Sequence, residues 1–184
     1  KKGLVRVLPV ADPARWTTSI DFPAVAGGDV LKESFSLGTP AGMYGFVFNT
    51  RRPVFSDPRV RRALAMLFDF EWVNRTLYHG LYARTGGYFD NSPLSSLGRA
   101  AGALERELLA PFAEEIEPAV MDGTWRPTEA DGSGRDRAVL RAAVGALGKA
   151  GYRIDGGVMK GPDGTPLAFE MLVAAQDQER LALA

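Results

Sequence analysis

The chain has 184 residues, of which 46% are hydrophobic and 24% charged, a composition typical of a globular protein. Its 22 basic and 22 acidic side chains balance, so no net charge attracts nucleic acid or acidic substrates. The sequence contains no cysteine, which excludes disulfides, thiolate catalysis and cysteine-ligated zinc or iron–sulfur clusters. No apolar run approaches the roughly 20 residues that a membrane-spanning helix needs.

Residues 1–44 are predicted to be mainly connection. Residues 5–10 alternate weakly and predict an edge strand, because Pro9 cannot donate to a neighbouring strand. Residues 30–35 predict another short strand, and a helical turn is expected from Asp12 to Trp16.

Residues 45–69 predict a strand, a turn and a capped helix. The Phe-Val-Phe run at 46–48 is typical of a short buried strand. Asp57 is expected to cap a helix over residues 58–68, because its carboxylate accepts free N–H groups of the first turn. Pro58 at the first helical position loses no hydrogen bond, and apolar residues then recur at helical spacing.

Two helices and a long loop are predicted next. Asp69 is expected to cap a helix over residues 70–79, which Gly80 ends in a left-handed conformation. Residues 82–98 have loop composition, yet they hold Tyr82, Tyr88 and Phe89. Aromatic side chains in such a loop either fill a gap in the core or line a ligand surface. A short helix at 104–109 follows, and residues 121–135 are predicted to be loop.

The last third predicts a helix, a hairpin and a strand. Asp136 opens a helix that runs to residue 150 and stops at Gly151. A hairpin is expected over residues 152–160, because Asp155-Gly156-Gly157 favours a tight turn. Residues 167–173 alternate as a strand does, and a further helix begins near Asp177.

The predicted fold is therefore mixed α/β (α+β), with one domain over residues 1–184. Its sheet contains residues 46–48 and 167–173, and the helices at 58–68, 70–79 and 136–150 flank it. Along the chain, the order is connection with an edge strand (1–44), strand plus helices (45–120), loop (121–135), and helix, hairpin, strand and a starting helix (136–184).

Residue types that carry catalysis or hold metals are sparse. The single histidine, His79, ends a predicted helix, where capping or a bond to a carbonyl is a commoner role than general base. The Gly-Pro-Asp-Gly-Thr run at 161–165 lacks the lysine of a phosphate-binding loop. Residues 131–136 lack the ordered carboxylates of a calcium loop. We expect no catalytic residue, no metal and no cofactor.

Five arginines within twelve residues form a basic cluster, which we call the arginine cluster. It either binds phosphates of a nucleic acid or other anions, or forms a solvated helix face paired with acidic residues. A structural alternative is that Arg61 and Arg62 hold the helix against neighbouring strands or a partner lobe. The balanced net charge favours the second interpretation, and anion binding remains the alternative. The cluster consists of Arg51, Arg52, Arg59, Arg61 and Arg62.

Residues 48–64 contain Phe-Asn-Thr, then Pro-Val-Phe, then Asp-Pro-Arg-Val-Arg-Arg-Ala-Leu. This order resembles the extracellular solute-binding proteins of peptide ABC transporters, the dipeptide/oligopeptide-binding family. Residues 21–25, 68–72 and 88–92 are similar to its YejA-like branch. The resemblance implies a fragment of the second lobe of a two-lobe periplasmic receptor, exported and monomeric. It also implies binding of peptides or peptide-like compounds and delivery to a membrane permease, without enzymatic activity or nucleic acid.

Three places are candidates for the ligand-binding surface of such a lobe. The first follows the strand at 46–48. The second lies in the loop at residues 82–98, which we call the aromatic loop. The third follows the carboxyl end of a predicted strand, where ligands gather in open sheets. For each, the alternative is a loop that packs against its own lobe. An acidic partner for the ligand's amino terminus is implied by the resemblance, and Asp90 and Asp177 are the candidates. The candidate residues are Asn49, Arg51, Tyr88, Phe89, Asp90, Asn91, Gln176 and Asp177.

Overall fold

The computed structural model describes residues 7–10, 12–35 and 37–183, and the chain divides into two compact units. Unit 1 contains the described residues up to Tyr44 together with Asn74–Pro127. Unit 2 contains Gly45–Val73 and the described residues from Thr128 onward. The single domain that the sequence predicts stays a prediction.

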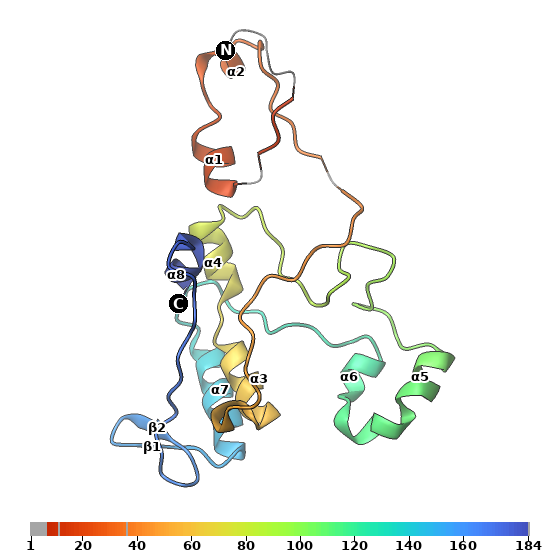
Figure 1. Cartoon of the computed structure of the whole chain (residues 1–184), viewed down its shortest axis with the longest axis vertical. Coiled ribbons are helices and arrows are strands. Elements are labelled where there is room, and N and C mark those ends of the chain that lie inside the picture. Colours follow the sequence, from red (N-terminus) through yellow and green to blue (C-terminus); the bar gives the residue numbers. More distant parts are fainter. Residues whose placement is uncertain (1–6, 11, 36, 184) are drawn as a thin grey trace. The chain divides into compact units, whose positions relative to one another are not determined.

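A pair of helices forms the core of unit 2. Helix α3 (Pro58–Met66) and helix α7 (Arg137–Lys149) lie side by side (Figure 1). Val60 and Ala63 of α3 are almost fully buried against Leu147 and Ala150. The small alanines let the two backbones approach closely, so little apolar area is needed to exclude water from this contact. Partly buried hydrophobic residues surround it, namely Leu64, Ala146, Tyr152, Met159 and Leu167.

Carboxylates begin these helices as the sequence predicts. The Asp57 Oδ1 atom accepts a hydrogen bond from the Arg59 N–H at 2.8 Å, and the Asp136 Oδ1 atom accepts from Ala138 and Val139. Asp69 likewise accepts from the Trp72 N–H at 2.8 Å and begins helix α4 (Phe70–Leu77). Each carboxylate satisfies N–H groups that the helix itself leaves unpaired. The helices expected at 58–68, 70–79 and 136–150 are confirmed.

A hairpin follows α7, also as predicted. Strand β1 (Arg153–Asp155) pairs antiparallel with strand β2 (Val158–Lys160). Gly156 and Gly157 have φ angles of +59° and +79°, the left-handed conformation that a two-residue turn with the twist of the strands requires. The Leu167 N–H then donates to the Met159 carbonyl at 2.7 Å, which brings the following segment back to the hairpin.

The larger predicted sheet is not formed, so this part of the expectation is wrong. In the described part of the chain the only sheet is the β1–β2 pair, and residues 46–48 and 167–173 are not strands. A strand requires a neighbouring backbone in hydrogen-bonding register, and beyond the Leu167 N–H, which bonds to Met159, neither segment has one there. Ring packing replaces pairing: Phe55 lies 5.2 Å from Phe48 and 5.3 Å from Phe169 between ring centroids.

The two strands expected in residues 1–44 are not found either. The prediction at 5–10 begins outside the described residues, and its remaining residues, 7–10, are not in a strand. Residues 30–35 have no regular secondary structure. The described fold is thus mixed, with helices predominating over one short hairpin.

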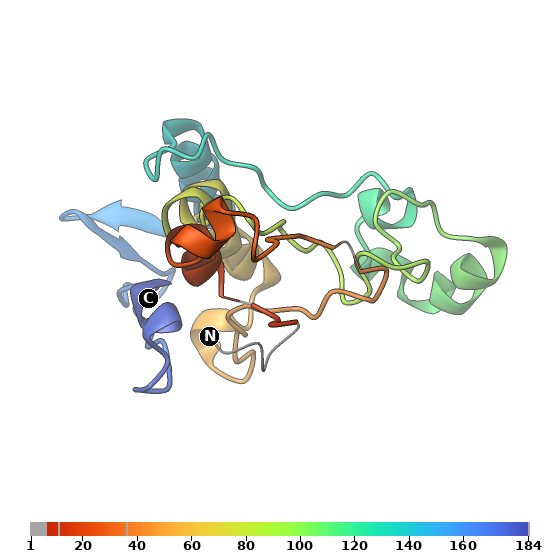
Figure 2. The same ribbon diagram turned by 90° about the horizontal axis from the view of Figure 1, so that it is seen from above.

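Unit 1 consists of short helices joined by polar contacts. In its second half, α5 (Ala103–Leu109), the 3₁₀ helix η2 (Ala110–Glu115) and α6 (Pro118–Met121) form one group, and α5 lies next to α6 in both views (Figures 1 and 2). The Arg106 guanidinium joins them by donating to the carbonyls of Ala101 and Met121, both at 3.0 Å. The helix predicted at 104–109 is confirmed.

The remaining helices are short. Unit 1 begins with α1 (Pro13–Thr18) and α2 (Pro23–Ala26), and Asp12 caps α1 through the Arg15 N–H. Unit 2 also contains the 3₁₀ helix η1 (Pro53–Phe55) and α8 (Gln178–Leu183). None of the described helices has the length and apolar character to cross a membrane.

Candidate functional site

The turn at Asn49 and Arg51 closes on itself in unit 2. The Asn49 Oδ1 atom accepts from the Arg51 backbone N–H at 3.2 Å, and the Asn49 carbonyl accepts from the Arg52 N–H at 3.0 Å. An asparagine that binds its own backbone two residues on is typical of such a turn. The Asn49 amide oxygen is therefore used locally, whereas the Arg51 side chain is exposed.

In unit 1 the aromatic loop is organised around the carboxylate of Asp90. The Asp90 Oδ2 atom accepts from the backbone N–H groups of Gly86 and Gly87, the latter at 3.2 Å. The Ser95 hydroxyl donates to Asp90 Oδ1 at 2.9 Å. Partial burial raises the pKa of Asp90, but these three hydrogen bonds favour the ionised form more strongly and leave the pKa below its ordinary value.

The next residue, Asn91, fastens the same loop to residues 37–41. Its Nδ2 group donates to the carbonyls of Leu37 and Thr39, the latter at 3.1 Å. The Ala41 N–H donates to the Asp90 carbonyl at 2.7 Å. Asn91 has a φ angle of +62°, a left-handed conformation that asparagine tolerates better than most residues. The loop therefore has a defined conformation although it contains no helix or strand.

The two aromatic rings of this loop point to solvent. Tyr88 is 73% exposed and Phe89 is 52% exposed. Of the two roles that the sequence left open for aromatic residues here, filling a gap in the core does not apply to these two. Tyr82 differs, because its ring lies edge-on to buried Tyr78 with centroids 4.7 Å apart.

Gln176 and Asp177 precede helix α8 in unit 2. The Asp177 Oδ1 atom accepts from the Arg180 N–H at 3.0 Å, and Oδ2 lies 3.4 Å from the Arg180 Nε atom. Asp177 is thus a helix cap, as its position at the start of a helix suggests. Gln176 is exposed. Among the described residues, no hydrogen bond or ion pair joins Asp177 to the turn at Asn49.

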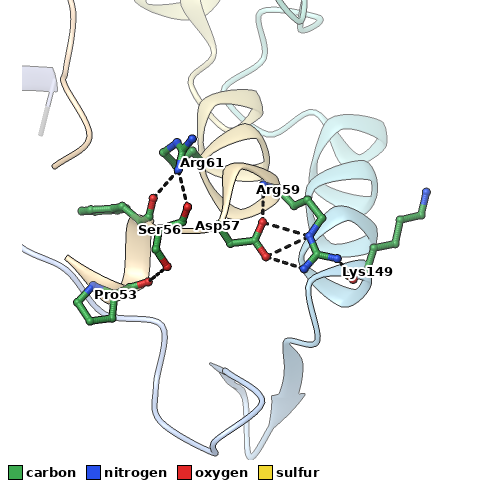
Figure 3. A network of polar contacts seen from close by, with 7 residues as sticks. Pro53, Ser56, Asp57, Arg59, Arg61 and Lys149 are labelled. Carbon is green, nitrogen blue, oxygen red and sulfur yellow. Dashed lines mark hydrogen bonds and ion pairs between the residues drawn. The ribbon is translucent and has the colours of Figure 1, made fainter. Parts of the chain in front are cut away.

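Two members of the arginine cluster bind backbone carbonyls of their own unit (Figure 3). Arg59 forms an ion pair with Asp57 at 2.6 Å and donates to the Lys149 carbonyl at the end of α7 at 2.9 Å. Arg61 donates to the carbonyls of Phe55 and Ser56 at 2.7 and 2.9 Å. The hydrogen bonds of the Arg59 side chain lower the pKa of Asp57. These contacts support a structural role for part of the cluster.

Sequence reasoning missed a hollow in unit 1. It is open to solvent, has a volume of about 260 Å³ and lies between the aromatic loop and the segment after α6. Trp125, in a stretch predicted only as loop, was the available signal, because a tryptophan is rarely placed in a loop without a packing or binding role. The lining residues are Gly86, Ser96, Leu97, Gly98, Val120, Gly123 and Trp125.

Another missed contact stabilises the end of α4. The Asn74 amide donates to the Tyr82 carbonyl at 2.7 Å and accepts from the Tyr82 N–H at 3.1 Å. The two hydrogen bonds run in opposite directions between the same two residues, as they do between antiparallel strands. They hold the start of the aromatic loop against α4. The segment between Asn74 and Tyr82 contains His79 and Gly80, whose φ angles are +53° and +75°.

The described residues contain no group of three or more histidine, aspartate or glutamate side chains that could hold a metal ion. Many carboxylates are instead bound to backbone N–H groups. Asp69 accepts from Gly134, Glu71 from Ala130, and Asp136 from Asp131. These bonds fix the 128–136 loop against the starts of α4 and α7.

Comparison with known proteins identifies the family. Residues 10–184 match the bacterial extracellular solute-binding proteins, family 5, in the part described as its middle. A putative binding protein of Brucella melitensis is 50% identical over the whole chain. The peptidoglycan-binding protein YepA and the probable peptide-binding protein YejA, both of Agrobacterium fabrum, are 41% and 36% identical over the whole chain.

In each of these relatives the match covers only part of the longer protein. The chain spans 30% of the Brucella protein, 31% of YepA and 30% of YejA. The match to the family nevertheless extends over almost all of the chain, including the residues at 48–64 that carry the resemblance. The chain therefore belongs to family 5 of the bacterial extracellular solute-binding proteins.

Proposed function

We propose that the full-length protein containing this chain is the substrate-binding component of an ABC transporter. It binds peptides or peptide-like compounds in the periplasm and delivers them, as a monomer, to a membrane permease. The observation that carries the proposal is the similarity, over the whole chain, to proteins named for binding peptidoglycan and peptides. Its work is binding and release, and no bond of the ligand is broken.

The mechanism we propose is closure of two lobes around an extended ligand. A peptide held in this way pairs its backbone with free strand edges, while its side chains enter roomy, hydrated pockets. Residues 168–173 support this. They form no strand in the described part of the chain, and none of their backbone groups is hydrogen-bonded to another backbone group there, so a peptide backbone can pair with them. Because the backbone is common to all peptides, such pairing accepts many ligand sequences.

Within this chain we propose ligand contacts at the exposed side chains of the three candidate places. Arg51 offers a positive charge for a carboxylate, and Tyr88 and Phe89 offer ring faces. Gln176 offers an amide, and the Asp177 carboxylate, although it caps α8 and pairs with Arg180, is the proposed partner for an amino terminus. The supporting observation for four of them is exposure to solvent, which holds for Arg51, Tyr88, Phe89 and Gln176. Asn49 is proposed as a contact through the turn that it forms.

Calorimetric titration of the full-length protein tests the proposal. One titration uses a mixed pool of tripeptides, and a second uses the murein tripeptide L-alanyl-γ-D-glutamyl-meso-diaminopimelate. We expect saturable heat with at least one of them and none with free amino acids, because single residues lack the backbone length to pair. Silence with both the pool and the murein tripeptide would refute a peptide-binding function.

A further inference from the structure

The aromatic loop of unit 1 has an unusual distribution of polar and apolar side chains. Its acidic side chain is turned inward: Asp90 is half-buried and accepts three hydrogen bonds from Gly86, Gly87 and Ser95. Its aromatic residues, Tyr88 and Phe89, point outward. Most loops do the reverse, because exposing rings forfeits apolar burial. Exposure is shared with many other apolar side chains of the described residues, and what distinguishes these two rings is the hydrogen-bonded loop that carries them.

The hydrogen bonds of the loop hold the backbone on both sides of the two rings. The Asp90 carboxylate accepts hydrogen bonds from Gly86 and Gly87, which precede the two rings in the chain, and from Ser95, which follows them. Asn91 ties the loop to an independent segment through the carbonyls of Leu37 and Thr39. A ring on such a support loses little conformational freedom when a ligand contacts it, and rigid aromatic anchors of this kind dominate many binding surfaces.

We propose that Tyr88 and Phe89 are the ligand contacts of this loop, and that Asp90 and Asn91 are positioning residues that hold the rings in place. The inference rests on the proposed peptide-binding function. In this inference the Asp90 carboxylate binds N–H groups of its own loop and does not bind the ligand's amino terminus. The ligand chemistry that suits the two rings is the aliphatic surface of a peptide backbone and its side chains.

Substitutions at Asp90 distinguish the two roles. Asn keeps an oxygen that accepts from the glycine N–H groups and an amide that bonds the Ser95 hydroxyl, but it removes the negative charge. If Asp90 positions the rings, D90N keeps the affinity within about three-fold of wild type, while D90A weakens it about ten-fold. If the carboxylate binds a ligand amine, both substitutions weaken binding to a similar extent, and the inference is overturned.

A double-mutant cycle shows whether Asp90 acts through the rings. Tyr88→Ala and Phe89→Ala are each expected to raise the dissociation constant about ten-fold. In the variant that lacks both rings, D90A should then have almost no further effect, because there is nothing left to position. A loss from D90A that is unchanged in the ring-less variant would indicate a different role and would overturn the inference.

A matched control comes from another loop carboxylate. Asp163 accepts from the Thr165 N–H at 3.0 Å and from the Thr165 hydroxyl at 2.6 Å, so it also binds its own turn. Its turn, residues 161–165, contains no aromatic residue, and D163A is expected to leave the affinity unchanged. At Asn91, the substitution N91D replaces the amide NH2 group, which donates to two carbonyls, with a carboxylate oxygen that only accepts. We expect N91D to weaken binding about as much as D90A does.

The measurement is calorimetric titration of the full-length protein and its variants with the murein tripeptide, or with the tripeptide pool if the pool gives the stronger signal. Thermal unfolding of each variant verifies folding. Ser95→Ala removes the bond to Asp90 and the bond from the Leu97 N–H but keeps both glycine bonds to Asp90, and it provides a milder variant if D90A does not fold. Silence of the wild type refutes the proposed function and this inference together. Binding by the wild type with unaltered affinity in Y88A and F89A refutes the inference alone.

Discussion

At the scale of single residues, aspartates shape this chain by binding backbone N–H groups close by in sequence. Asp57 and Asp136 cap helices, and Asp90 and Asp163 close loops. The pKa of each lies below the ordinary value of 3.8. The largest cause is the Arg59 side chain for Asp57, the Val139 N–H for Asp136 and the Thr165 hydroxyl for Asp163. Hydrogen bonds to the ionised carboxylate are the common cause.

The cap at Asp57 gives a prediction about stability. Asp57→Ala removes the bond to the Arg59 N–H and the ion pair with Arg59, and we expect the full-length protein to lose about 1 kcal/mol of unfolding free energy, mostly from the cap. Urea unfolding measures this loss. Asp57→Asn keeps a capping oxygen and should lose less, so equal losses in both variants would contradict the assignment.

The same pair has a predictable pH dependence. The pKa of Asp57 in the folded protein lies below its unfolded value, because the Arg59 side chain favours the carboxylate. Its contribution to stability is therefore fully present above the unfolded pKa and is lost as the pH falls through the folded pKa. The stability difference between wild type and Asp57→Asn should shrink below about pH 4, where the carboxylate becomes protonated. A difference that persists unchanged at lower pH would contradict this.

A glycine in unit 1 allows two backbone segments to touch. Gly123 has a φ angle of +69°, and a Cβ atom there would lie 2.3 Å from the Arg99 carbonyl carbon. Gly123→Ala adds the strain of a left-handed conformation, about 1–2 kcal/mol, to a steric clash of about 1–3 kcal/mol. Gly28→Ala is the control, because its φ is +82° with no atom within 4 Å, so it tests the strain alone. Thermal unfolding should show the larger loss for Gly123→Ala, and equal losses would exclude the clash.

At the scale of elements, the α3–α7 pair forms the best-packed part of the described residues. Val60, Ala63, Leu147 and Ala150 exclude water between the helices, and Arg59 joins the two ends through the Lys149 carbonyl. Packing and polar contacts therefore reinforce each other in the same place. We expect this part of unit 2 to show the slowest amide exchange in the chain.

Helix α7 offers a stabilising substitution. Gly145 is exposed in its interior, and a Cβ atom there would meet no atom within 4 Å. Gly145→Ala should raise the unfolding free energy by about 0.5–1 kcal/mol, because alanine loses less backbone entropy in a helix. The mirror substitution at exposed Ala142, Ala142→Gly, should lower it by a similar amount. Urea unfolding compares them, and a Gly145→Ala variant that is destabilised would show that α7 packs differently from the structure described.

At the scale of the whole molecule, much apolar surface is exposed in the described residues. On α5 and η2, Leu104, Leu108 and Phe112 follow one another at spacings of four residues and are 68%, 65% and 54% exposed. The relatives are about three times longer than the chain, which spans 30% of the Brucella protein. We propose that other residues of the full-length protein cover part of this surface, because exposed apolar patches of this kind are rare in free-standing proteins.

The alternative of nucleic-acid binding is also tested on the whole molecule. The net charge of the chain is zero, and Arg59 and Arg61 already bind carbonyls or a carboxylate of their own unit. We expect the full-length protein to show no salt-dependent binding to a short DNA duplex. Fluorescence anisotropy over a range of salt concentrations measures this. Salt-dependent binding that R51A and R52A abolish would support the alternative function, whereas R59A is expected to affect stability alone.

The sequence by itself determined the features that depend on neighbouring residues. A carboxylate before a helix, a proline at its first position and a glycine after its end act within a few residues, so α3, α4 and α7 were predicted with their caps. Paired glycines likewise predicted the hairpin, because glycine adopts the left-handed conformation that both turn positions require without strain. The ordered residues at 48–64 also indicated the family, since a long match is far more specific than a short motif.

Only the tertiary structure decided which partner each group takes across longer distances. The Phe-Val-Phe run at 46–48 has the composition of a strand, but pairing needs a second backbone, and in the described residues Phe48 contacts Phe55 in its place. Asp90 and Asn91 are typical ligand-binding residue types, yet the folded chain brings Gly86, Ser95 and Leu37 to them first. A polar side chain binds whatever donor or acceptor the fold places within reach, and its residue type alone does not specify that partner.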